Sequence, residues 1–272
     1  MKLESSTDTG PQILPLRAFS DNYIWLLERG RHAVLVDPGD AGPALAHLAA
    51  AGLQLVAILV THHHPDHTGG IEGILAQLQG DVPIPVYGPA SEDIASVNCP
   101  LVDGDRVELP ELQASFEVIA VPGHTRGHIA YYGRKLCGCG VLFCGDTLFP
   151  CGCGRLFEGT PAQMHASLGR LAALPAATKL YCAHEYTQAN IHFALAVEPD
   201  NEALHQREQQ VARLRAADLP TVPSTVELEL ATNPFLRVTA PTVRASAQRS
   251  SGEQLTEPVA VFAAIRAWKN KF

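Results

Sequence analysis

Four histidines and one aspartate fall within the seven residues of the segment T-H-H-H-P-D-H, at positions 61–67. Burying so many imidazoles beside a carboxylate is costly unless a cation compensates them. Side chains two positions apart in an extended turn point the same way, so we expect His62 and His64 to share one ion. The proline then turns the chain, which redirects Asp66 and His67 toward a second ion. Zn²⁺ favours such a mixture of imidazole and carboxylate ligands.

Three further residues of ligand type are needed, because neither of these pairs makes a complete site. His124, Asp146 and His184 each follow a short apolar segment and then a glycine or alanine. Chemistry in α/β proteins is placed at the carboxyl ends of strands, where these side chains would meet the histidine segment. A carboxylate has two oxygens and can bridge two cations, which makes Asp146 the natural shared ligand. The first predicted site is His62, His64 and His124 with Asp146, and the second is Asp66, His67 and His184 with Asp146.

The remaining histidines have plainer interpretations. We expect His63 and His128 to face solvent or to support the ligands from behind. Five others are interpreted as ordinary surface or helix residues: His32, His47, His165, His192 and His205. Asp37, in V-D-P-G-D, either orients a ligand imidazole or simply forms a turn before the proline and glycine. The sequence leaves both roles of Asp37 open.

The elements that must position these residues alternate between short β-rich segments and turn signals. Strands are expected at 23–28, 33–36, 55–60, 116–121, 129–132, 141–143 and 179–181, and helices at 43–51, 70–78 and 164–174. Residues 41–60 carry no formal charge and have the length of a membrane span. Their glycines, proline and polar residues instead predict a short helix, a break at Gly52 and a buried strand.

After residue 181 the pattern becomes helical. Helices are expected at 190–197 and 202–217, followed by a proline-rich connection at 219–223. A last helix is predicted to begin after a cap at Thr256, with Pro258 in its first turn and with Val259, Phe262, Ile265 and Trp268 directed to a core. These patterns predict a mixed α/β domain that ends near residue 184 and a smaller helical domain after it.

Composition narrows the class of protein. The 272 residues are 46% hydrophobic and 18% charged, which is typical of a globular enzyme and excludes a disordered or fibrous chain. A formal net charge of -8 gives no reason to expect nucleic-acid or membrane partners. Seven unevenly spaced cysteines do not form a disulfide ladder, and no signal peptide opens the chain. We therefore expect a cytoplasmic protein with free thiols.

Motifs along most of the chain resemble those of a known protein family. T-H-x-H-x-D-H, with the later Gly-His, Gly-Asp and His positions, resembles the metallo-β-lactamase superfamily. Within it, the chain resembles the glyoxalase II or hydroxyacylglutathione hydrolase family. The motifs are D-N-Y at 21–23, P-G-H-T-x-G-H at 122–128, G-D-T-L-F at 145–149, G-C-G-R at 152–155, E-G-T at 158–160 and H-E-Y-T at 184–187. The C-terminal motifs, which are more specific, are P-T-V-P-S-T at 220–225, N-P-F-L-R at 233–237 and R-x-x-K at 266–269. Only the first dozen residues are expected to be an extra tail.

The resemblance implies an αββα sandwich with a binuclear site at 1–184 and an all-α, glutathione-binding domain at 185–272. It places the glutathione contacts on Arg155, Tyr186, Arg266 and Lys269. Arg266 and Lys269 are three apart and share a helix face, which suits a carboxylate but is equally typical of a solvated helix end. The family often has Lys and Tyr where this chain has Arg155 and Phe157, so weaker or altered glutathione binding is expected.

The implied reaction is hydrolysis of S-(2-hydroxyacyl)glutathione thioesters, such as S-D-lactoylglutathione to D-lactate and glutathione, the second step of methylglyoxal detoxification. The expected nucleophile is a metal-bridging hydroxide held by Asp146 and Asp66, because two cations about 3.5 to 4 Å apart lower the pKa of bridging water toward ~7. Two Zn²⁺ per chain are expected, with Fe or Mn as alternatives, in a monomer whose partner is the small-molecule thioester.

Two other readings stay open at this stage. Another enzyme of the same superfamily, such as a lactonase or a persulfide dioxygenase, would share the histidine segment. A non-catalytic zinc or thiol-sensing protein could use the two C-x-C pairs, Cys137/Cys139 and Cys151/Cys153. We favour a structural role for Cys151 and Cys153, because they lie in the G-C-G loop. The sequence does not explain Cys137 and Cys139.

Overall fold

The computed structural model describes residues 10–78, 80 and 82–272, and its core is built on two mixed sheets. The first sheet has the order β1 (Gln12–Ala18), β2 (Asn22–Arg29), β3 (His32–Val36), β4 (Gln54–Leu59), β5 (Val86–Pro89) and β6 (Cys99–Leu101). The second has the order β14 (Ser224–Thr225), β13 (Lys179–Cys182), β10 (Val141–Gly145), β9 (Ile129–Gly133), β8 (Ala114–Ala120) and β7 (Arg106–Leu109). A separate hairpin consists of β11 (Leu148–Phe149) and β12 (Gly152–Cys153).

The two sheets pack face to face around the main hydrophobic core. Alternate residues of β2, such as Trp25 and Leu27, meet Phe116 and Phe143 of the second sheet in one buried cluster. Tyr131 crosses between the sheets, since its hydroxyl on β9 donates a 2.8 Å hydrogen bond to the carbonyl oxygen of Val60, just after β4. Inward-facing residues that alternate along each strand are the reason such sheets bury one another.

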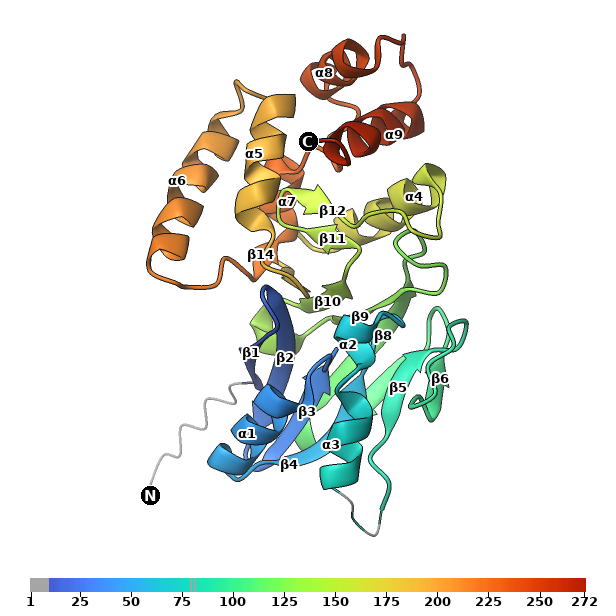
Figure 1. Ribbon diagram of the computed structural model, residues 1–272, viewed down its shortest axis with the longest axis vertical. Helices are drawn as coiled ribbons and strands as arrows, with labels where there is room; N and C mark the ends of the chain where they lie inside the picture. Colours follow the sequence, from blue (N-terminus) through green and yellow to red (C-terminus); the bar gives the residue numbers. More distant parts are fainter. Residues whose placement is uncertain (1–9, 79, 81) are drawn as a thin grey trace, which may run out of the picture.

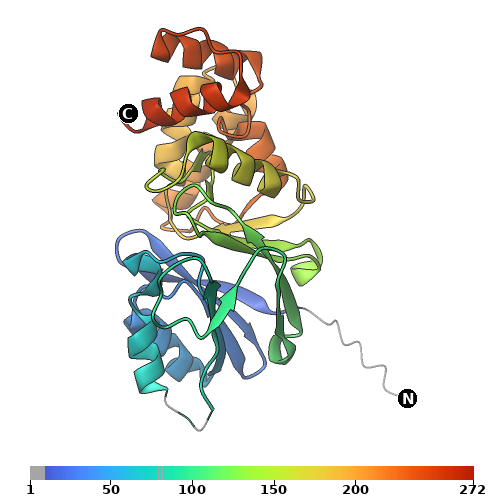
Figure 2. The same ribbon diagram turned by 90° about the vertical axis from the view of Figure 1, so that its right-hand side faces the viewer.

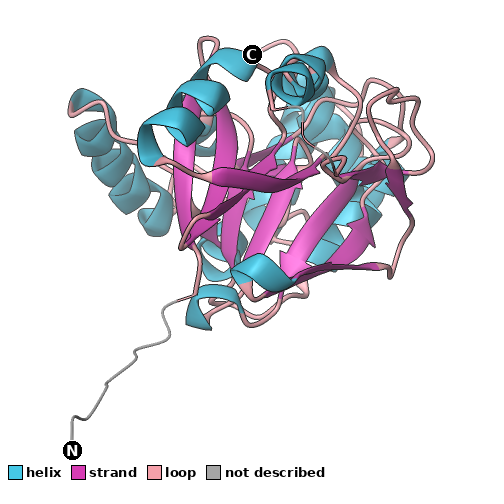
Figure 3. Ribbon diagram, turned by 90° about the horizontal axis from the view of Figure 1, so that it is seen from below, coloured by secondary structure: helices cyan, strands magenta, loops and turns pink. Residues whose placement is uncertain are grey.

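Helices cover both outer faces of this sandwich. Helices α1 (Ala41–Ala51) and α3 (Ile71–Gln77) lie on the first sheet, where Leu48 and Ile74 pack against Leu26 and Ile58. Helix α4 (Pro161–Ala172) lies on the second sheet, and its expected apolar stripe at Met164, Leu168 and Leu171 is buried there. The strands lie between the helical layers (Figure 3). The expected αββα arrangement is confirmed.

The chain after residue 184 is mostly helical and gathers at one end of the sandwich (Figures 1 and 2). It contains α5 (Thr187–Val197), α6 (Glu202–Ala216), α7 (Val226–Thr232), α8 (Pro241–Ser251) and α9 (Pro258–Lys269). Helix α9 packs against both α8 and α4, and β14 pairs with β13. The C-terminal helices therefore join the second sheet through an added strand and through α4.

Several boundaries differ from the sequence-based expectations. The last helix is preceded by Glu257 at the cap position, not Thr256, because Pro258 occupies the first helical position. Within that helix Val261 is buried while Val259 is only partly so, since Val261 lies one turn before Ile265. Among the elements that were not expected are strands β1, β5, β6 and β7 and helices α7 and α8. The expected tail falls largely at residues 1–9, outside the described residues, and β1 already begins at Gln12.

The backbone geometry of the uncharged segment at 41–60 decides between a membrane span and two short elements. Helix α1 ends at Ala51 and is capped by Gly52, which adopts the left-handed conformation (φ 62°) that favours glycine, and β4 follows. This confirms a short helix, a glycine break and a strand. In the part of the chain that the structure describes, no helix has the length and apolar character needed to cross a membrane.

Candidate metal centre

The predicted ligands arrive from four loops that follow β4, β8, β10 and β13. His62 and His64 follow β4 directly, and the short helix α2 (Pro65–Thr68) then carries Asp66 and His67. Proline at the first position of α2 is the turn that the sequence predicted. His124, Asp146 and His184 follow β8, β10 and β13 respectively. The structure thus brings all seven predicted ligands to one edge of the sandwich.

Three imidazoles form the first group. Nδ1 of His64 lies 3.0 Å from Nε2 of His62 and 3.0 Å from Nε2 of His124. Ligand atoms of these three residues all lie within 4.8 Å of one another. His62 and His124 are buried, whereas His64 is half-buried. Three ring nitrogens therefore converge on one point, which is the arrangement expected of a cation site.

Asp66, His67 and His184 form the second group, and their ligand atoms also lie within 4.8 Å of one another. Oδ2 of Asp66 lies 3.6 Å from Nε2 of His67 and 3.4 Å from Nε2 of His184. Asp66 is about half-exposed on its side chain, while both histidines are buried. The open side of the second group is therefore the side of Asp66.

Asp146 lies between the two groups and turns one oxygen to each. Its Oδ2 lies 3.4 Å from Nε2 of His124, and its Oδ1 lies 3.5 Å from Nε2 of His67 and 3.4 Å from Nε2 of His184. The preceding Gly145 has φ 46° and no room for a side chain, because a Cβ there would lie 2.4 Å from Oγ1 of Thr61. Glycine at this position lets the strand end approach the histidine segment closely.

The donor set fits two cations. Nε2 of His67 and Oδ1 of Asp146 are buried atoms without a hydrogen-bond partner, and both face the space shared by the second group. Buried polar atoms are rarely left unsatisfied unless a water molecule or an ion completes them. Imidazole nitrogens and carboxylate oxygens are the ligands that first-row divalent metals accept. The His and Asp clusters and the fold therefore support a binuclear metal site.

Electrostatics keep the two groups in different protonation states. Burial and the neighbouring histidines lower the pKa of His62, and burial and His124 lower that of His64. Burial opposes the charged form of His184 too, but Asp146, Asp66 and Asp21 outweigh it and raise its pKa to about 11. Without a cation, the second group therefore holds a proton that a metal ion must displace, because metal ligands bind deprotonated.

Residues behind the ligands fix their orientation. Oδ2 of Asp37 lies 3.1 Å from Nδ1 of His67, and its Oδ1 accepts a 2.7 Å hydrogen bond from the backbone N–H of Thr61. Asp37 thus lies beside a ligand imidazole and also forms a turn, since its carbonyl oxygen accepts from the N–H of Gly39 at 2.9 Å, so both predicted roles fit the structure. Nε2 of His128 accepts a 3.1 Å hydrogen bond from the N–H of Asp146, and its ring stacks on His62 at 4.6 Å. His128 supports the ligands, as expected.

Three supporting residues were missed by sequence reasoning. Asp21 lies in the turn between β1 and β2, and Asn22 begins β2. Oδ1 of Asp21 lies 2.8 Å from Nδ1 of His184, and Nδ2 of Asn22 donates to Oδ2 of Asp66 at 3.1 Å. Glu92, in the loop after β5, accepts from the backbone N–H of His63 at 2.6 Å. The D-N-Y motif was a signal for the first two, but nothing local in the sequence singled out Glu92.

A cleft of about 740 Å³ opens beside the metal centre. His124 and Asp146 line its inner end, and aromatic side chains line its walls. All four predicted glutathione contacts line this cleft: Arg155, Tyr186, Arg266 and Lys269. Phe157 and His192 line it as well. His192, interpreted from the sequence as an ordinary helix residue, is therefore exposed on the wall of the cleft.

The two cationic side chains of α9, Arg266 and Lys269, lie in different environments. Arg266 is only 4% exposed, and its Nη1 donates a 2.9 Å hydrogen bond to the carbonyl oxygen of Cys153. Lys269 donates to the carbonyl oxygen of Ala189 at 3.2 Å. Burial and the charge of Arg266 lower the pKa of Lys269 to about 8. Neither residue is a freely solvated helix end, and Arg266 links the last helix to the G-C-G loop.

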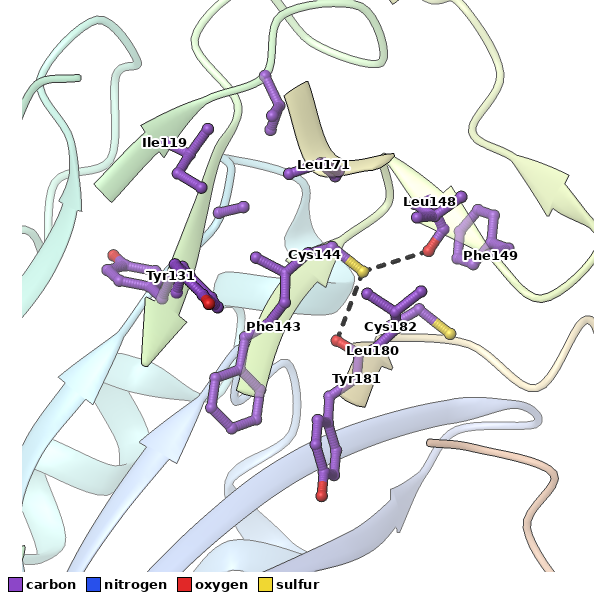
Figure 4. Close-up of a cluster of buried hydrophobic side chains, with 14 of the residues drawn as sticks. Ile119, Tyr131, Phe143, Cys144, Leu148, Phe149, Leu171, Leu180, Tyr181 and Cys182 are labelled. Carbon is purple, nitrogen blue, oxygen red and sulfur yellow. Dashed lines mark hydrogen bonds between the residues drawn. The ribbon is translucent and has the colours of Figure 1, made fainter. Parts of the chain in front are cut away.

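The cysteines are mostly shielded from solvent. Six of the seven are buried or partly buried, all except the exposed Cys137, and all seven are free. The Cys144 thiol donates to the carbonyl oxygens of Leu148 at 3.2 Å and Tyr181 at 3.7 Å (Figure 4). Among the described residues, the candidate metal-binding groups contain histidine and aspartate and no cysteine. The geometry gives a thiolate metal site no support.

Two family models match the chain in succession. The model of the metallo-beta-lactamase superfamily matches residues 18–184, and that of the hydroxyacylglutathione hydrolase C-terminus matches residues 185–272. The chain is 56% identical over 262 residues to the hydroxyacylglutathione hydrolase of Alkalilimnicola ehrlichii, covering 96% of this chain and 99% of that one. It is 52% identical over 260 residues to that of Nitrosomonas eutropha, covering 96% and 98%.

Solved structures share the fold. The crystal structure of TTHA1623 in a di-iron-bound form is 28% identical, with a TM-score of 0.56, and the match covers 83% of this chain and 100% of that one. ETHE1 from Myxococcus xanthus is 24% identical, with a TM-score of 0.59 and coverage of 95% and 97%, which shows the fold alone. The family models and the identity to the two curated relatives agree. The chain belongs to the hydroxyacylglutathione hydrolase family of the metallo-beta-lactamase superfamily.

Proposed function

We propose that this protein is a metal-dependent thioester hydrolase that converts S-(2-hydroxyacyl)glutathione, such as S-D-lactoylglutathione, to a 2-hydroxy acid and glutathione. The observation that carries the proposal is the position of Asp146, which faces both ligand groups at the inner end of a cleft lined by Arg155 and Lys269. Relatives that are 52% and 56% identical bear the name of this activity, which favours it over a lactonase or a persulfide dioxygenase.

We assign the ligands as the sequence predicted them. The first ion would be held by His62, His64 and His124 with Asp146, and the second by Asp66, His67 and His184 with Asp146. Zinc is the proposed metal at both sites, with iron or manganese as alternatives, because imidazole and carboxylate accept all three. When bound, two neighbouring cations lower the pKa of water toward neutrality and polarise the carbonyl that is attacked.

Asp66 and Asp146 would orient the attacking water by accepting its hydrogen bonds. His184, close to Oδ2 of Asp66, and the amide of Asn22 lower the pKa of Asp66. Burial opposes ionisation of Asp146, but His67 and His184 outweigh it and lower its pKa as well. Both carboxylates are therefore ionised at neutral pH and able to accept hydrogen bonds from a water molecule held between them. Fixed acceptors at the reacting centre need no reorganisation during the reaction.

The cleft suits the glutathione part of the substrate. Arg155, Tyr186, Arg266 and Lys269 are the proposed contacts, and three of them are cationic side chains facing an anionic tripeptide. The guanidinium of Arg266 already donates to the carbonyl oxygen of Cys153. We therefore assign the direct contact with the glutathione carboxylate chiefly to Lys269 and Arg155. Phe157 lies edge-on to His64 and His124, with ring centroids 5.6 and 5.3 Å away, so an apolar surface borders the acyl end. The glutathione thiolate is weakly basic and leaves without a strong acid.

The decisive experiment is elemental analysis of the purified protein beside an assay with S-D-lactoylglutathione. We expect two metal ions per chain and hydrolysis that is abolished by a chelator and restored by zinc. A protein that holds two ions but turns over a lactone and no glutathione thioester would refute the substrate. A protein that hydrolyses the thioester with one ion per chain would refute the binuclear assignment.

The proposal also covers the oligomeric state, the cellular compartment and the roles of the two domains. We propose a monomer in the cytoplasm, with residues 1–184 forming the catalytic domain and residues 185–272 the glutathione-binding domain. The seven free cysteines suit a reducing compartment. Light scattering coupled to size exclusion is expected to give the mass of a single chain, 29.1 kDa. A mass of twice this value would replace the monomer with a dimer.

A further inference from the structure

The carboxylate of Glu92 joins the two loops that carry the first group of ligands. Its Oε2 accepts a 2.6 Å hydrogen bond from the backbone N–H of His63 and lies 2.9 Å from Nδ1 of the same residue. His63 stands between His62 and His64, so this contact fixes the backbone from which both ligands project. The side chain of Glu92 is 3% exposed, which places its charge inside the protein.

The other oxygen of Glu92 serves the second loop. Oε1 accepts hydrogen bonds from the hydroxyl of Thr125 and, at 3.0 Å, from the N–H of Gly127. Thr125 follows His124 directly. A Cβ at Gly127 would lie 2.4 Å from Cγ of Glu92, so only glycine admits the carboxylate so close to the loop. One buried carboxylate thus clamps the segments that supply His62, His64 and His124.

The second group is supported from a different part of the fold, the turn between β1 and β2. Asn22 is 7% exposed, and its side-chain amide donates to Oδ2 of Asp66 at 3.1 Å. Asp21 lies 2.8 Å from Nδ1 of His184, and its carbonyl oxygen accepts from the N–H of Glu185 at 2.9 Å. Tyr23 then donates to Oε2 of Glu185 at 2.8 Å. Three consecutive residues therefore hold Asp66 and the His184 loop.

The two supports do not overlap. Within the described chain, the hydrogen bonds of the Glu92 side chain end on His63, Thr125 and Gly127, and those of the Asn22 side chain end on Asp66. Glu92 comes from the loop after β5, in the interior of the first sheet's order, whereas Asn22 begins β2. The ligand groups meet at Asp146, which both share, and at His62 and His67, whose ligand atoms lie within 4.8 Å of each other and of Asp146.

From this separation we infer that each metal site has its own positioning residues: Glu92 for the first site, and Asn22 with Asp21 for the second. The inference rests on the ligand sets given under the proposed function. Residues behind metal ligands typically contribute about 10- to 100-fold to metal affinity. Loss of one support should therefore weaken one site and leave the other nearly unchanged, which a general loss of stability would not do.

The test separates the sites by removing one ligand at a time from the full-length protein. His64→Ala disables the first site and His184→Ala disables the second, so each background reports zinc binding at the remaining site. Asn22→Ala or Glu92→Ala is then added to each background. Zinc per chain is measured by elemental analysis after dialysis of chelator-treated protein against a series of buffered zinc concentrations. Asp93→Asn, an exposed carboxylate next to Glu92, is the matched control.

We expect Asn22→Ala to weaken zinc binding about 10- to 100-fold in the His64→Ala background, and less than about 3-fold in the His184→Ala background. Glu92→Ala should show the reverse pattern, and Asp93→Asn should change neither background. Equal weakening in both backgrounds, or weakening in neither, would overturn the inference. Where Glu92→Ala does not fold, Thr125→Val removes one donor to the carboxylate and should show the same selectivity, and its failure to do so would count equally against the inference.

Zinc content and thioester hydrolysis measured on the unsubstituted protein distinguish a failure of this inference from a failure of the proposed function. Two zinc ions and full thioester hydrolysis in the parent, without selectivity in the variants, would overturn the inference alone. Fewer than two ions in the parent would overturn both the binuclear assignment and the inference built on it. Thermal unfolding of the zinc-free variants identifies any that are destabilised as a whole.

Discussion

The ring of Tyr186 stacks on the imidazole of His184, with centroids 4.7 Å apart and planes only 4° from parallel. Tyr186 directly precedes α5 and also lines the cleft, so it couples a proposed metal ligand to the proposed glutathione site. The stack places an aromatic face against a ligand that a bound cation would make electron-poor.

This relationship predicts different results for two substitutions of Tyr186. Tyr186→Phe keeps the stacked ring and removes only the hydroxyl, so we expect unchanged metal content and a KM for S-D-lactoylglutathione raised about 3- to 10-fold, the worth of one hydrogen bond. Tyr186→Ala removes the stack and should also lower zinc affinity. Elemental analysis and steady-state kinetics check both. Equal metal loss in the two variants would contradict a role for the stacked ring.

Asp146→Ala is predicted to lose both metal ions and to reduce kcat/KM by more than about 100-fold, the upper range for residues that only support ligands. The reason is that each oxygen of Asp146 faces a different ligand group. Elemental analysis of the purified variant decides the result. Retention of either ion at full occupancy, together with normal turnover, would refute the bridging assignment.

Arg266→Ala is predicted to raise KM for the glutathione thioester more than it lowers kcat, by about 10-fold or 1.4 kcal/mol. The buried guanidinium donates to the carbonyl oxygen of Cys153 and so holds the loop that carries Arg155. Arg266→Lys cannot reproduce a planar guanidinium contact and should rescue only partly. An unchanged KM in both variants would remove the last helix from the binding site.

The pH dependence of KM should follow Lys269. Its pKa is lowered to about 8 by burial and by Arg266, so the side chain is cationic below pH 8 and loses its charge as the pH rises through that value. Attraction for an anionic substrate is therefore present at pH 7 and weakens above pH 8, where KM should rise. Lys269→Arg keeps the charge at high pH and should abolish that rise, as a pH profile from 6.5 to about 9.5 would show. A persistent rise in this variant would point to another group.

Glu229→Ala is predicted to destabilise the protein by about 3 to 5 kcal/mol, because it leaves a buried arginine without its partner. Oε1 of Glu229 lies 2.6 Å from Nη2 of Arg207, and the two side chains are 0% and 4% exposed. Chemical denaturation measures the free energy of unfolding. The double variant Arg207→Met with Glu229→Leu should recover only the part caused by the unpaired charge, because the N–H of Cys151 and the side-chain amide of Asn233 also lose their acceptor. Equal destabilisation in the single and double variants would contradict the explanation.

Local patterns in the sequence predicted the ligand-type residues of the site better than the residues that hold those ligands in place. The histidine segment at 61–67 contains five ligand-type side chains, and a proline redirects the last two of them, so a division into two groups could be predicted from spacing. In the structure His62 and His64 lie in one group and Asp66 and His67 in another, while His62 and His67 also share a third group with Asp146. Asp37 carried a local signal as well, although the sequence could not distinguish a turn former from a support. Strands such as β2 and β4 were evident because buried strands are continuous apolar segments.

The tertiary structure alone decided how the site is held together. Glu92 reaches His63 across 29 positions, and Asp21 reaches His184 across 163, so no local pattern could pair them. Short or polar elements such as β6 and α8 were also missed, because cross-strand pairing and packing stabilise them more than their own composition does. The sequence by itself determined which side chains could bind metal. Only the packing of two sheets and a helical end determined which of them meet, because hydrogen bonds and burial depend on distance in space and not on distance along the chain.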